Sequence, residues 1–277
     1  MPTKRPEERY EIDPDDGLRR EIVGSWAREK HLRLQHYVDI SRAARRKYRG
    51  NSTFIDLYCG PGRAKIKGTE EVTPGSAIAA GLVAAKHDPF GAIHISDLDP
   101  INVNACGQRL ATEGIRNVRT YIGKAEDNVK EVVAGLSPSG LHFAFLDPYS
   151  VLAMPFRVIE ALATLPKMDL LIHFSAMDLQ RNVKLLMENG KLEQFAPGWN
   201  SVVDPAVRND IAVLAIFRHW CGLIRGLGYK EVSDNVERVS GPKNQRLYWL
   251  VAASKAQLGK DLWGKVSNVT SQGRLPF

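Results

Sequence analysis

Between residues 53 and 174 the chain alternates short apolar runs with stretches of helical spacing, and this alternation limits the fold more than any other feature. Strands that alternate with helices in this way form βαβ units, whose strands lie parallel in one sheet. Apolar runs such as 142–146 suit strands that are buried on both faces. The predicted strands are 53–57, 92–96, 118–122, 142–146 and 169–174, and the predicted helices are 76–86, 101–113, 125–134 and 155–165.

The regions on either side of this alternation have other patterns. Residues 1–24 are polar and rich in Pro, Asp and Glu, so we predict an extended N-terminal arm. Residues 25–48 have helical spacing and predict one helix. Its expected apolar face consists of Trp26, Leu32, Leu34, Tyr37, Val38 and Ile40.

After the last predicted parallel strand the regular spacing ends. Residues 175–204 contain the turn signals Asn189-Gly190 and Pro197-Gly198, so we predict an insertion that walls the substrate side of the sheet. Residues 205–227 predict a long helix. Residues 229–239 and 246–253 then predict two antiparallel strands around a Gly-Pro-Lys-Asn turn.

The net charge of +7 and the pI of about 9.3 favour polyanionic partners such as tRNA, DNA or an acidic protein. A basic, solvated surface is the alternative. A cluster of five cations at the end of the predicted 25–48 helix either complements the helix dipole or contacts phosphates. It consists of Arg42, Arg45, Arg46, Lys47 and Arg49.

The cysteine pattern and the apolar runs predict the compartment. Cys59, Cys106 and Cys221 are far apart and form no CxxC pair, which predicts neither a zinc ribbon nor a disulfide framework and suits a reducing cytoplasm. The N-terminus has no apolar core, so we expect no signal peptide. The chain has no run of about 18 apolar residues, so we expect no membrane span.

The strongest local motif runs from Phe54 to Gly62, where an apolar strand leads into a bend with two glycines. Glycines allow a backbone to approach a ligand closely, and this bend follows a strand where open α/β sheets bind ligands. Lys65 replaces the third glycine of a dinucleotide fingerprint, and the next predicted helix begins only near residue 76. Asp56 makes the loop acidic, which suits the cationic S-adenosylmethionine better than a pyrophosphate.

Acidic residues follow the second and third predicted strands as well. Asp97 is placed to accept hydrogen bonds from ribose hydroxyls, with Leu98 beside it, whereas Asp99 suits the N-cap of the next helix. The third loop brings Ala125 and Glu126 toward the expected adenine. A simple strand-to-helix turn is the alternative interpretation of that loop.

The fourth strand is followed by Asp147-Pro148-Tyr149. Asp147 is placed to hold a substrate amino group and Tyr149 to stack on a planar substrate; capping and packing are the alternatives. No Pro-Cys follows this strand, which argues against thiolate attack on a pyrimidine. Neither a Gly-x-Ser-x-Gly elbow nor a His-Glu-x-x-His motif occurs, and the histidine spacing predicts no metal site.

Taken together, these motifs resemble the three-Cys-motif partner (TcmP) family, which is similar to class I methyltransferases. The matching stretches are 23–30, 54–62, 74–76, 145–149, 181–182 and 248–258. The resemblance implies a Rossmann-like class I methyltransferase fold over residues 25–277: a mostly parallel seven-stranded sheet that ends in an antiparallel hairpin, with helices on both faces. It also implies a partner protein with three clustered cysteines of the radical iron–sulfur type.

The resemblance implies S-adenosylmethionine as cofactor, a cofactor site that includes Asp56, Tyr58 and Gly62, and roles for Trp26 and Lys30. Together with the residues at the strand ends, it gives two sets of candidate site residues. The cofactor-binding set is Asp56, Tyr58, Gly60, Gly62, Asp97, Leu98, Ala125, Glu126 and Asp147. The catalytic set is Asp147, Tyr149 and Lys30, with Trp26 on the same helix as Lys30. One departure is Lys124, which stands where the family has an Asp, and an ammonium cannot accept a bond from the adenine amino group.

Three functions are therefore compatible with the sequence. The first is a methyltransferase that acts on a nitrogen or oxygen, with a nucleic acid as the leading acceptor. The second is a methyltransferase-like binding module that docks the three-cysteine partner without turnover. The third, an NAD-dependent enzyme, is disfavoured by Lys65.

Overall fold

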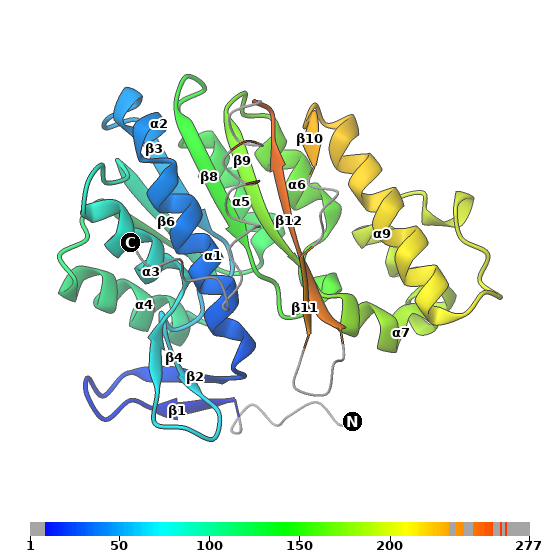
Figure 1. Ribbon diagram of the computed structural model, residues 1–277, viewed down its shortest axis with the longest axis horizontal. Helices are drawn as coiled ribbons and strands as arrows, with labels where there is room; N and C mark the ends of the chain where they lie inside the picture. Colours follow the sequence, from blue (N-terminus) through cyan, green and yellow to red (C-terminus); the bar gives the residue numbers. More distant parts are fainter. Residues whose placement is uncertain (1–8, 233–236, 241–245, 257–260, 262–263, 265–277) are drawn as a thin grey trace.

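Five parallel strands form the centre of the main sheet in the computed structural model, which describes residues 9–232, 237–240, 246–256, 261 and 264 (Figure 1). The strand order is β10-β12-β9-β8-β3-β6-β7, with β11 also paired to β12. β12 runs antiparallel to β9, and β10 and β11 pair antiparallel with β12. The strands are β3 (Ser52–Asp56), β6 (Ala92–Asp97), β7 (Val118–Ile122), β8 (Leu141–Leu146), β9 (Met168–Phe174), β10 (Glu231–Val232), β11 (Glu237–Ser240) and β12 (Arg246–Ser254).

This order and direction confirm the predicted fold. All five predicted parallel strands are present, with bounds within one residue of those expected. The sheet has eight strands instead of seven because β10 and β11 pair with different parts of β12. The expected hairpin turn lies outside the described residues.

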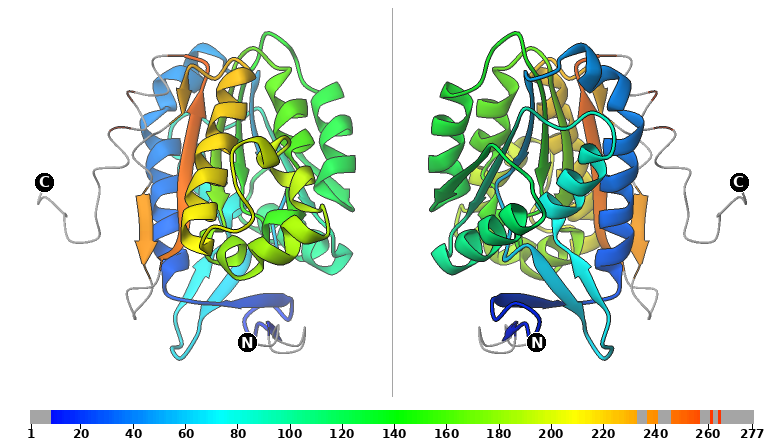
Figure 2. Two further views of the ribbon diagram at one scale, coloured as in Figure 1. Left: turned by 90° about the vertical axis from the view of Figure 1, so that its right-hand side faces the viewer. Right: turned by 90° about the vertical axis from the view of Figure 1, so that its left-hand side faces the viewer.

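Helices cover both faces of the sheet because neighbouring residues of each central strand are buried on opposite sides (Figure 2). Phe54 faces a core built with α1, α3 and α4, whereas Ile55 faces a core built with α5, α6, α7 and α9. The helices are α1 (Trp26–Ile40), α2 (Arg42–Lys47), α3 (Ser76–Ala85), α4 (Pro100–Thr112), α5 (Ala125–Ala134), α6 (Phe156–Ala163), α7 (Ala176–Glu188), α8 (Leu192–Phe195) and α9 (Asn209–Gly226).

The predicted 25–48 helix is divided into α1 and α2 at Ser41. The Ser41 hydroxyl donates to the Val38 carbonyl at 3.0 Å and accepts a bond from Arg45 at 2.7 Å, so this side chain competes with the helical backbone pattern. The expected apolar face is correct at Leu34, Tyr37 and Val38, whereas Leu32 is exposed. Within the described residues, no helix has the length and apolar character of a membrane span.

The 175–204 insertion is more ordered than its turn signals suggested. It contains α7 and α8, and α7 packs on α9 and β12. The Asp178 carboxylate accepts a hydrogen bond from the Val151 backbone at 3.0 Å, which fastens α7 to the segment after β8. The insertion therefore lies at the carboxyl ends of the strands, as we expected.

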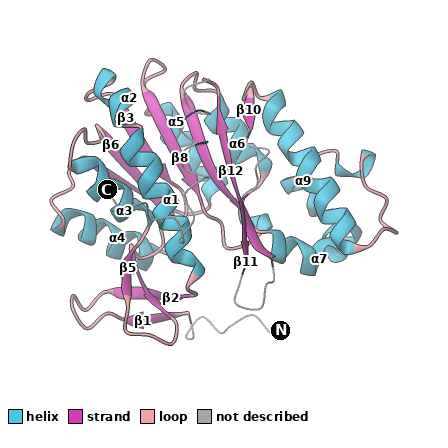
Figure 3. Cartoon of the chain, viewed as in Figure 1, coloured by secondary structure: helices cyan, strands magenta, loops and turns pink. Residues whose placement is uncertain are grey.

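The prediction of an extended N-terminal arm is wrong for the residues that the structure describes. Residues 9–24 form β1 (Tyr10–Ile12) and β2 (Arg19–Val23), which join β4 (Arg63–Ile66) and β5 (Val72–Pro74) in a second sheet of order β1-β2-β4-β5. Figure 3 shows this small sheet beyond one end of the main strands. The local spacing of the sequence did not predict this small sheet, because β2 pairs with β4, about 40 residues away, and all four strands are short.

A buried ionic cluster fastens the small sheet to the main fold. The Asp13 carboxylate is inaccessible to solvent and lies 3.1 to 3.5 Å from Arg20, Arg63 and Arg109. Arg109, on α4, also forms a two-point bond to Asp16 at 2.7 and 2.9 Å. The same guanidinium donates to the backbone carbonyls of residues 19 and 61, each at 2.7 Å, so it joins β2, the two-glycine bend and α4.

Replacing Arg109 with Met is expected to lower the free energy of unfolding by about 3 kcal/mol, because it leaves the buried Asp13 carboxylate with one cation fewer. The measurement is urea unfolding followed by circular dichroism. Arg116→Met removes an exposed guanidinium from the loop after α4 and serves as the control. Equal stability of the two variants would contradict the structural role of Arg109.

Candidate functional site

One cavity of about 1250 Å³ lies where the carboxyl ends of the five parallel strands meet the small sheet. Every one of these strands contributes lining residues: Tyr58 follows β3, Asp97 ends β6, Ala125 follows β7, Asp147 follows β8 and His173 lies in β9. Ligands of open α/β sheets bind at this edge. The volume exceeds that of an ordinary small-molecule pocket, so the cavity has room for two ligands side by side.

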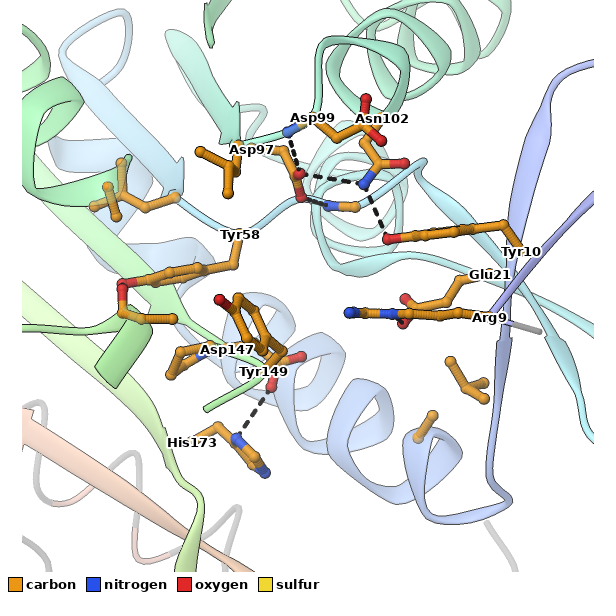
Figure 4. Close-up of a pocket in the computed structure, with 18 of the residues that line it drawn as sticks. Arg9, Tyr10, Glu21, Tyr58, Asp97, Asp99, Asn102, Asp147, Tyr149 and His173 are labelled. Carbon is orange, nitrogen blue, oxygen red and sulfur yellow. Dashed lines mark hydrogen bonds and ion pairs between the residues drawn. The ribbon is translucent and has the colours of Figure 1, made fainter. Parts of the chain in front are cut away.

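The two-glycine bend and the acidic end of β6 converge, as we predicted. The Gly60 backbone donates a hydrogen bond to Asp97 Oδ2 at 3.0 Å (Figure 4). Asp97 Oδ1 accepts from the Asp99 backbone at 2.9 Å and from the Asn102 amide at 3.1 Å. A carboxylate has about four acceptor positions, so Asp97 keeps room for one further donor. Asp99 caps α4 by accepting from the Ile101 backbone at 2.9 Å, also as predicted.

Gly60 and Gly62 serve different purposes. Gly60 has a φ of +55° and lines the cavity. Gly62 has a φ of +79° and lies outside it, where a Cβ would come 2.9 Å from Ile78 Cδ1 and 3.0 Å from Cys106 Cα. The assignment of Gly62 to cofactor binding is therefore wrong: this glycine allows the bend to pack against α3 and α4.

Asp56 also lies outside the cavity lining, contrary to its predicted role. It is fully buried, accepts a bond from the Tyr58 backbone at 3.1 Å and one from the Ser76 hydroxyl at 2.5 Å. Burial raises the pKa of Asp56 to about 7. Because Ser76 begins α3, this carboxyl group holds the bend to the start of that helix.

The helix order after the bend disfavours a dinucleotide. A pyrophosphate needs a helix N-terminus directly after the glycine loop. Here β4 and β5 follow the bend, and α3 begins only at Ser76. The buried Asp56 carboxyl group lies beside the start of α3, where it accepts a bond from the Ser76 hydroxyl.

The expected adenine end of the cavity contains Leu98, Ala125 and Glu126, as predicted, and also Lys124. Leu98 is 60 % exposed and Ala125 is buried, so together they offer an apolar wall. Arg157 bonds to Glu126 Oε2 alone, and Glu126 Oε1 lies 3.9 Å from Lys124 Nζ. A carboxylate oxygen with acceptor capacity is therefore present beside Lys124, which stands where the family has an Asp.

Asp147 lies at the other end of the cavity, between two nitrogen groups. Lys30 of α1 forms an ion pair with Asp147 Oδ2, and His173 Nδ1 lies 3.4 Å from Asp147 Oδ1. Burial opposes ionisation of Asp147, but the Lys30 ammonium outweighs burial and lowers the pKa of this carboxyl group. Burial lowers the pKa of His173 to about 4, so this ring is neutral at pH 7. The predicted catalytic residues Lys30 and Asp147 are thus in contact, and sequence patterns did not single out His173.

Aromatic rings line the middle of the cavity. Tyr149 is 67 % exposed, which leaves its ring free to stack on a planar group. The Tyr58 hydroxyl donates to the Ala153 carbonyl at 3.0 Å, so this ring is fixed. Trp26, at the start of α1, packs on Gly24 and is 39 % exposed.

Sequence analysis also missed two bonded pairs of polar residues in the cavity, four residues in all. Arg9 and Glu21 form an ion pair at 2.8 Å, and the Asn102 amide donates to the Tyr10 hydroxyl at 3.2 Å. Three of them come from the small sheet and the residue before it, which we had interpreted as an arm. No local signal identifies them, because their position depends on the pairing of β2 with β4.

Four of the five residues of the predicted basic cluster contact other residues of this chain. Arg45 is buried and bonds to backbone carbonyls, while Arg46 and Arg49 both pair with Asp88 at 3.2 and 3.3 Å. Arg42 lies 3.6 Å from Asp39, and Lys47 is exposed. Figure 1 shows α2 at the opposite end of the sheet from the small sheet, so the cluster lies away from the cavity.

Metal chemistry finds no support in the described part of the chain, where no group of three or more His, Cys, Asp or Glu side chains could hold an ion. All three cysteines are buried, and none of them forms a disulfide with another residue of the described chain.

Comparison with known proteins yields a fold likeness only. No family model matches the chain, and no curated protein matches its sequence. Among solved structures, it resembles EvdMO1 (15% identity, TM-score 0.42, covering 81% of this chain and 42% of that one). It also resembles Trm1 from Pyrococcus horikoshii with S-adenosyl-L-methionine (10% identity, TM-score 0.48, 88% and 62%). A third is the O-methyltransferase from Bacillus cereus in complex with SAH (15% identity, TM-score 0.44, 82% and 80%).

The chain spans about two fifths of the length of EvdMO1 and WbdD. Likenesses this distant carry no argument about activity.

Gly62→Ala is expected to destabilise the fold by about 2–4 kcal/mol, because it combines a left-handed backbone with a steric clash. Gly68→Ala is the matched control: Gly68 has the same φ of +79°, but no atom lies within 4 Å of the position that its Cβ would take. It should cost only about 1–2 kcal/mol. Chemical denaturation of both variants tests the assignment, and equal losses would contradict the packing role of Gly62.

The buried His173 predicts a pH effect on stability. Its pKa is about 4 in the folded protein and 6.5 in the unfolded chain, so the unfolded chain binds more protons between these values. Stability from this residue is therefore present above pH 6.5 and lost as the pH falls toward 4, by up to about 3 kcal/mol.

His173→Gln should make the fall in unfolding free energy between pH 7 and 4.5 shallower than in the wild-type protein. Comparing the two slopes cancels the opposite contribution of Asp56, whose pKa is raised to about 7. An unchanged slope, measured by urea unfolding at several pH values, would show that His173 is accessible to protons in the folded protein.

Proposed function

We propose that this chain is an S-adenosylmethionine-dependent methyltransferase. One observation carries the proposal: the bend at Gly60 and the carboxylate of Asp97 meet at 3.0 Å and line the same cavity as Asp147. The cavity joins an acceptor for a ribose hydroxyl to an apolar wall for a base, formed by Leu98 and Ala125. β4 and β5, and not a helix, follow the bend, and the Asp56 carboxyl group lies beside the start of α3, which supports a cofactor without phosphate.

The chain's own residues then serve mainly to position an acceptor. When bound, the cofactor supplies an electrophilic methyl group on a sulfonium, so orientation contributes most of the catalysis. Asp147, held by Lys30, accepts a hydrogen bond from the N–H or O–H of the acceptor. Tyr149 stacks on a planar acceptor, and the neutral ring of His173 lies 3.4 Å from Asp147 Oδ1.

A nucleic acid is the acceptor class that we favour, in view of the net charge of +7. The exposed cations at the cavity, Lys67 and Lys124, are better placed for phosphate contacts than the cluster on α2. Membership of the TcmP family, with a three-cysteine partner protein, belongs to the same proposal and rests on the sequence motifs. Transfer of a labelled methyl group to tRNA, rRNA, DNA or that partner is the decisive assay.

A binding module that docks the partner without turnover is the second candidate. Two observations favour it: Lys30 already neutralises Asp147, and Arg157 already engages Glu126. Binding of the cofactor product without methyl transfer to any of the four acceptors would support this candidate.

The cofactor proposal predicts that S-adenosylhomocysteine binds in a calorimetric titration and that NAD does not. Asp97→Asn should weaken this binding about tenfold or more, because it removes a charged acceptor from the ribose. Asp127→Asn, an exposed carboxylate of α5 outside the cavity lining, is the matched control. Tight binding of NAD, or equal affinities of the two variants, would argue against the proposal.

A further inference from the structure

The Arg9–Glu21 pair is a charged pair at the cavity that the proposed adenosine site leaves unused. Glu21 comes from β2, and Arg9 immediately precedes β1. Figure 4 shows the Arg9 guanidinium extending into the cavity toward Tyr149, with Glu21 beside it. Both side chains belong to the small sheet that Arg109 fastens to the main fold.

Each partner keeps free hydrogen-bonding capacity. Within the described residues, Arg9 Nε donates to Glu21 Oε1 at 2.8 Å, and no bond is found for the two terminal nitrogens of the guanidinium. Within the same residues, no hydrogen bond to Glu21 Oε2 is found either. This oxygen lies 3.7 Å from the position that a Cβ on Gly60 would take. The Arg9 guanidinium and the Glu21 Oε2 atom therefore lie side by side next to the glycine bend.

Two other charged groups, Asp56 and Lys30, already have partners. Asp56 is buried beneath the glycine bend and outside the cavity, with its oxygens bonded to Ser76 and to the Tyr58 backbone. Lys30 is paired with Asp147. Neither Asp56 nor Lys30 is therefore available to an amino-acid group at this point.

The proposed cofactor carries such a group: an α-ammonium and an α-carboxylate on one carbon. With Asp97 holding the ribose beside Gly60, the methionine end extends from the same bend. A bidentate guanidinium suits a carboxylate, and a carboxylate oxygen suits an ammonium. Arg9 can therefore bind the carboxylate of such a zwitterion while Glu21 binds its ammonium. Each charge then keeps an opposite charge beside it.

We propose, as an extension of the proposed function, that Arg9 and Glu21 bind the amino-acid head of the cofactor, Arg9 its carboxylate and Glu21 its ammonium. The small N-terminal sheet is then part of the cofactor site, in place of Asp56. Tyr10 supports this arrangement: its ring lies 5.4 Å from the Arg9 guanidinium, and its hydroxyl is joined through Asn102 to Asp97.

The test compares two ligands that differ only in the head group. S-adenosylhomocysteine carries it, whereas 5′-methylthioadenosine has the same nucleoside and sulfur without it. Calorimetric titration of the full chain with both ligands is carried out for the wild type, Arg9→Met and Glu21→Gln. Arg28→Met is the matched control, because Arg28 forms an exposed ion pair with Glu71 outside the cavity lining.

Arg9→Met and Glu21→Gln should each weaken S-adenosylhomocysteine about tenfold or more and leave methylthioadenosine within about twofold. Retained binding of methylthioadenosine also shows that the variant is folded. Arg9→Lys, which keeps the charge but loses the fork, should fall between Arg9→Met and the wild type.

The outcomes separate this inference from the proposed function. If both ligands weaken equally in Arg9→Met, or neither does, Arg9 does not bind the head group and the inference is overturned while the cofactor assignment stands. If the wild-type protein binds neither ligand, the proposed function itself fails and the inference falls with it.

Discussion

The Arg109 guanidinium is the contact on which the cavity depends. It bonds at once to Asp16 of the N-terminal segment, to the backbone before the second glycine, and to the carbonyl of Arg19 in β2. Desolvating an arginine is costly unless its donors are satisfied. Here the carboxylates of Asp13 and Asp16 and two carbonyls compensate that cost, so the small sheet has one favourable position over the strand ends.

This anchoring divides the cavity between two layers. The main sheet provides the parts that follow from strand order: the bend at Gly60, the acidic end of β6 at Asp97 and the loop after β8 at Asp147. The small sheet adds the opposite wall, with Arg9 and Glu21. A segment of about 15 residues and the β4–β5 hairpin thus form the side of the cavity that lies opposite the main sheet.

Sequence patterns predicted what depends on local spacing, and missed what depends on distant pairing. Strand and helix periodicity indicated the main sheet, and the strand ends indicated Gly60, Asp97 and Asp147. Gly62 and Asp56 were misassigned because a motif does not reveal which of its residues face a ligand and which face a neighbouring helix. The small sheet was missed because β2 finds its partner in β4, and the pairing of Arg46 with Asp88 was missed because Asp88 lies far along the chain.

Four ion pairs surround the cavity. Around the cavity, Arg9 pairs with Glu21, Lys30 with Asp147, Arg157 with Glu126 and Arg19 with Asp99. Groups held in pairs are oriented before a ligand arrives, and preorganised dipoles need little rearrangement when charge develops. A ligand that itself carries balanced charges can insert into such pairs one bond at a time. A pyrophosphate at the glycine bend would instead meet the carboxylates of Asp97 and Glu21, which is a physical reason to favour a sulfonium nucleoside at that point.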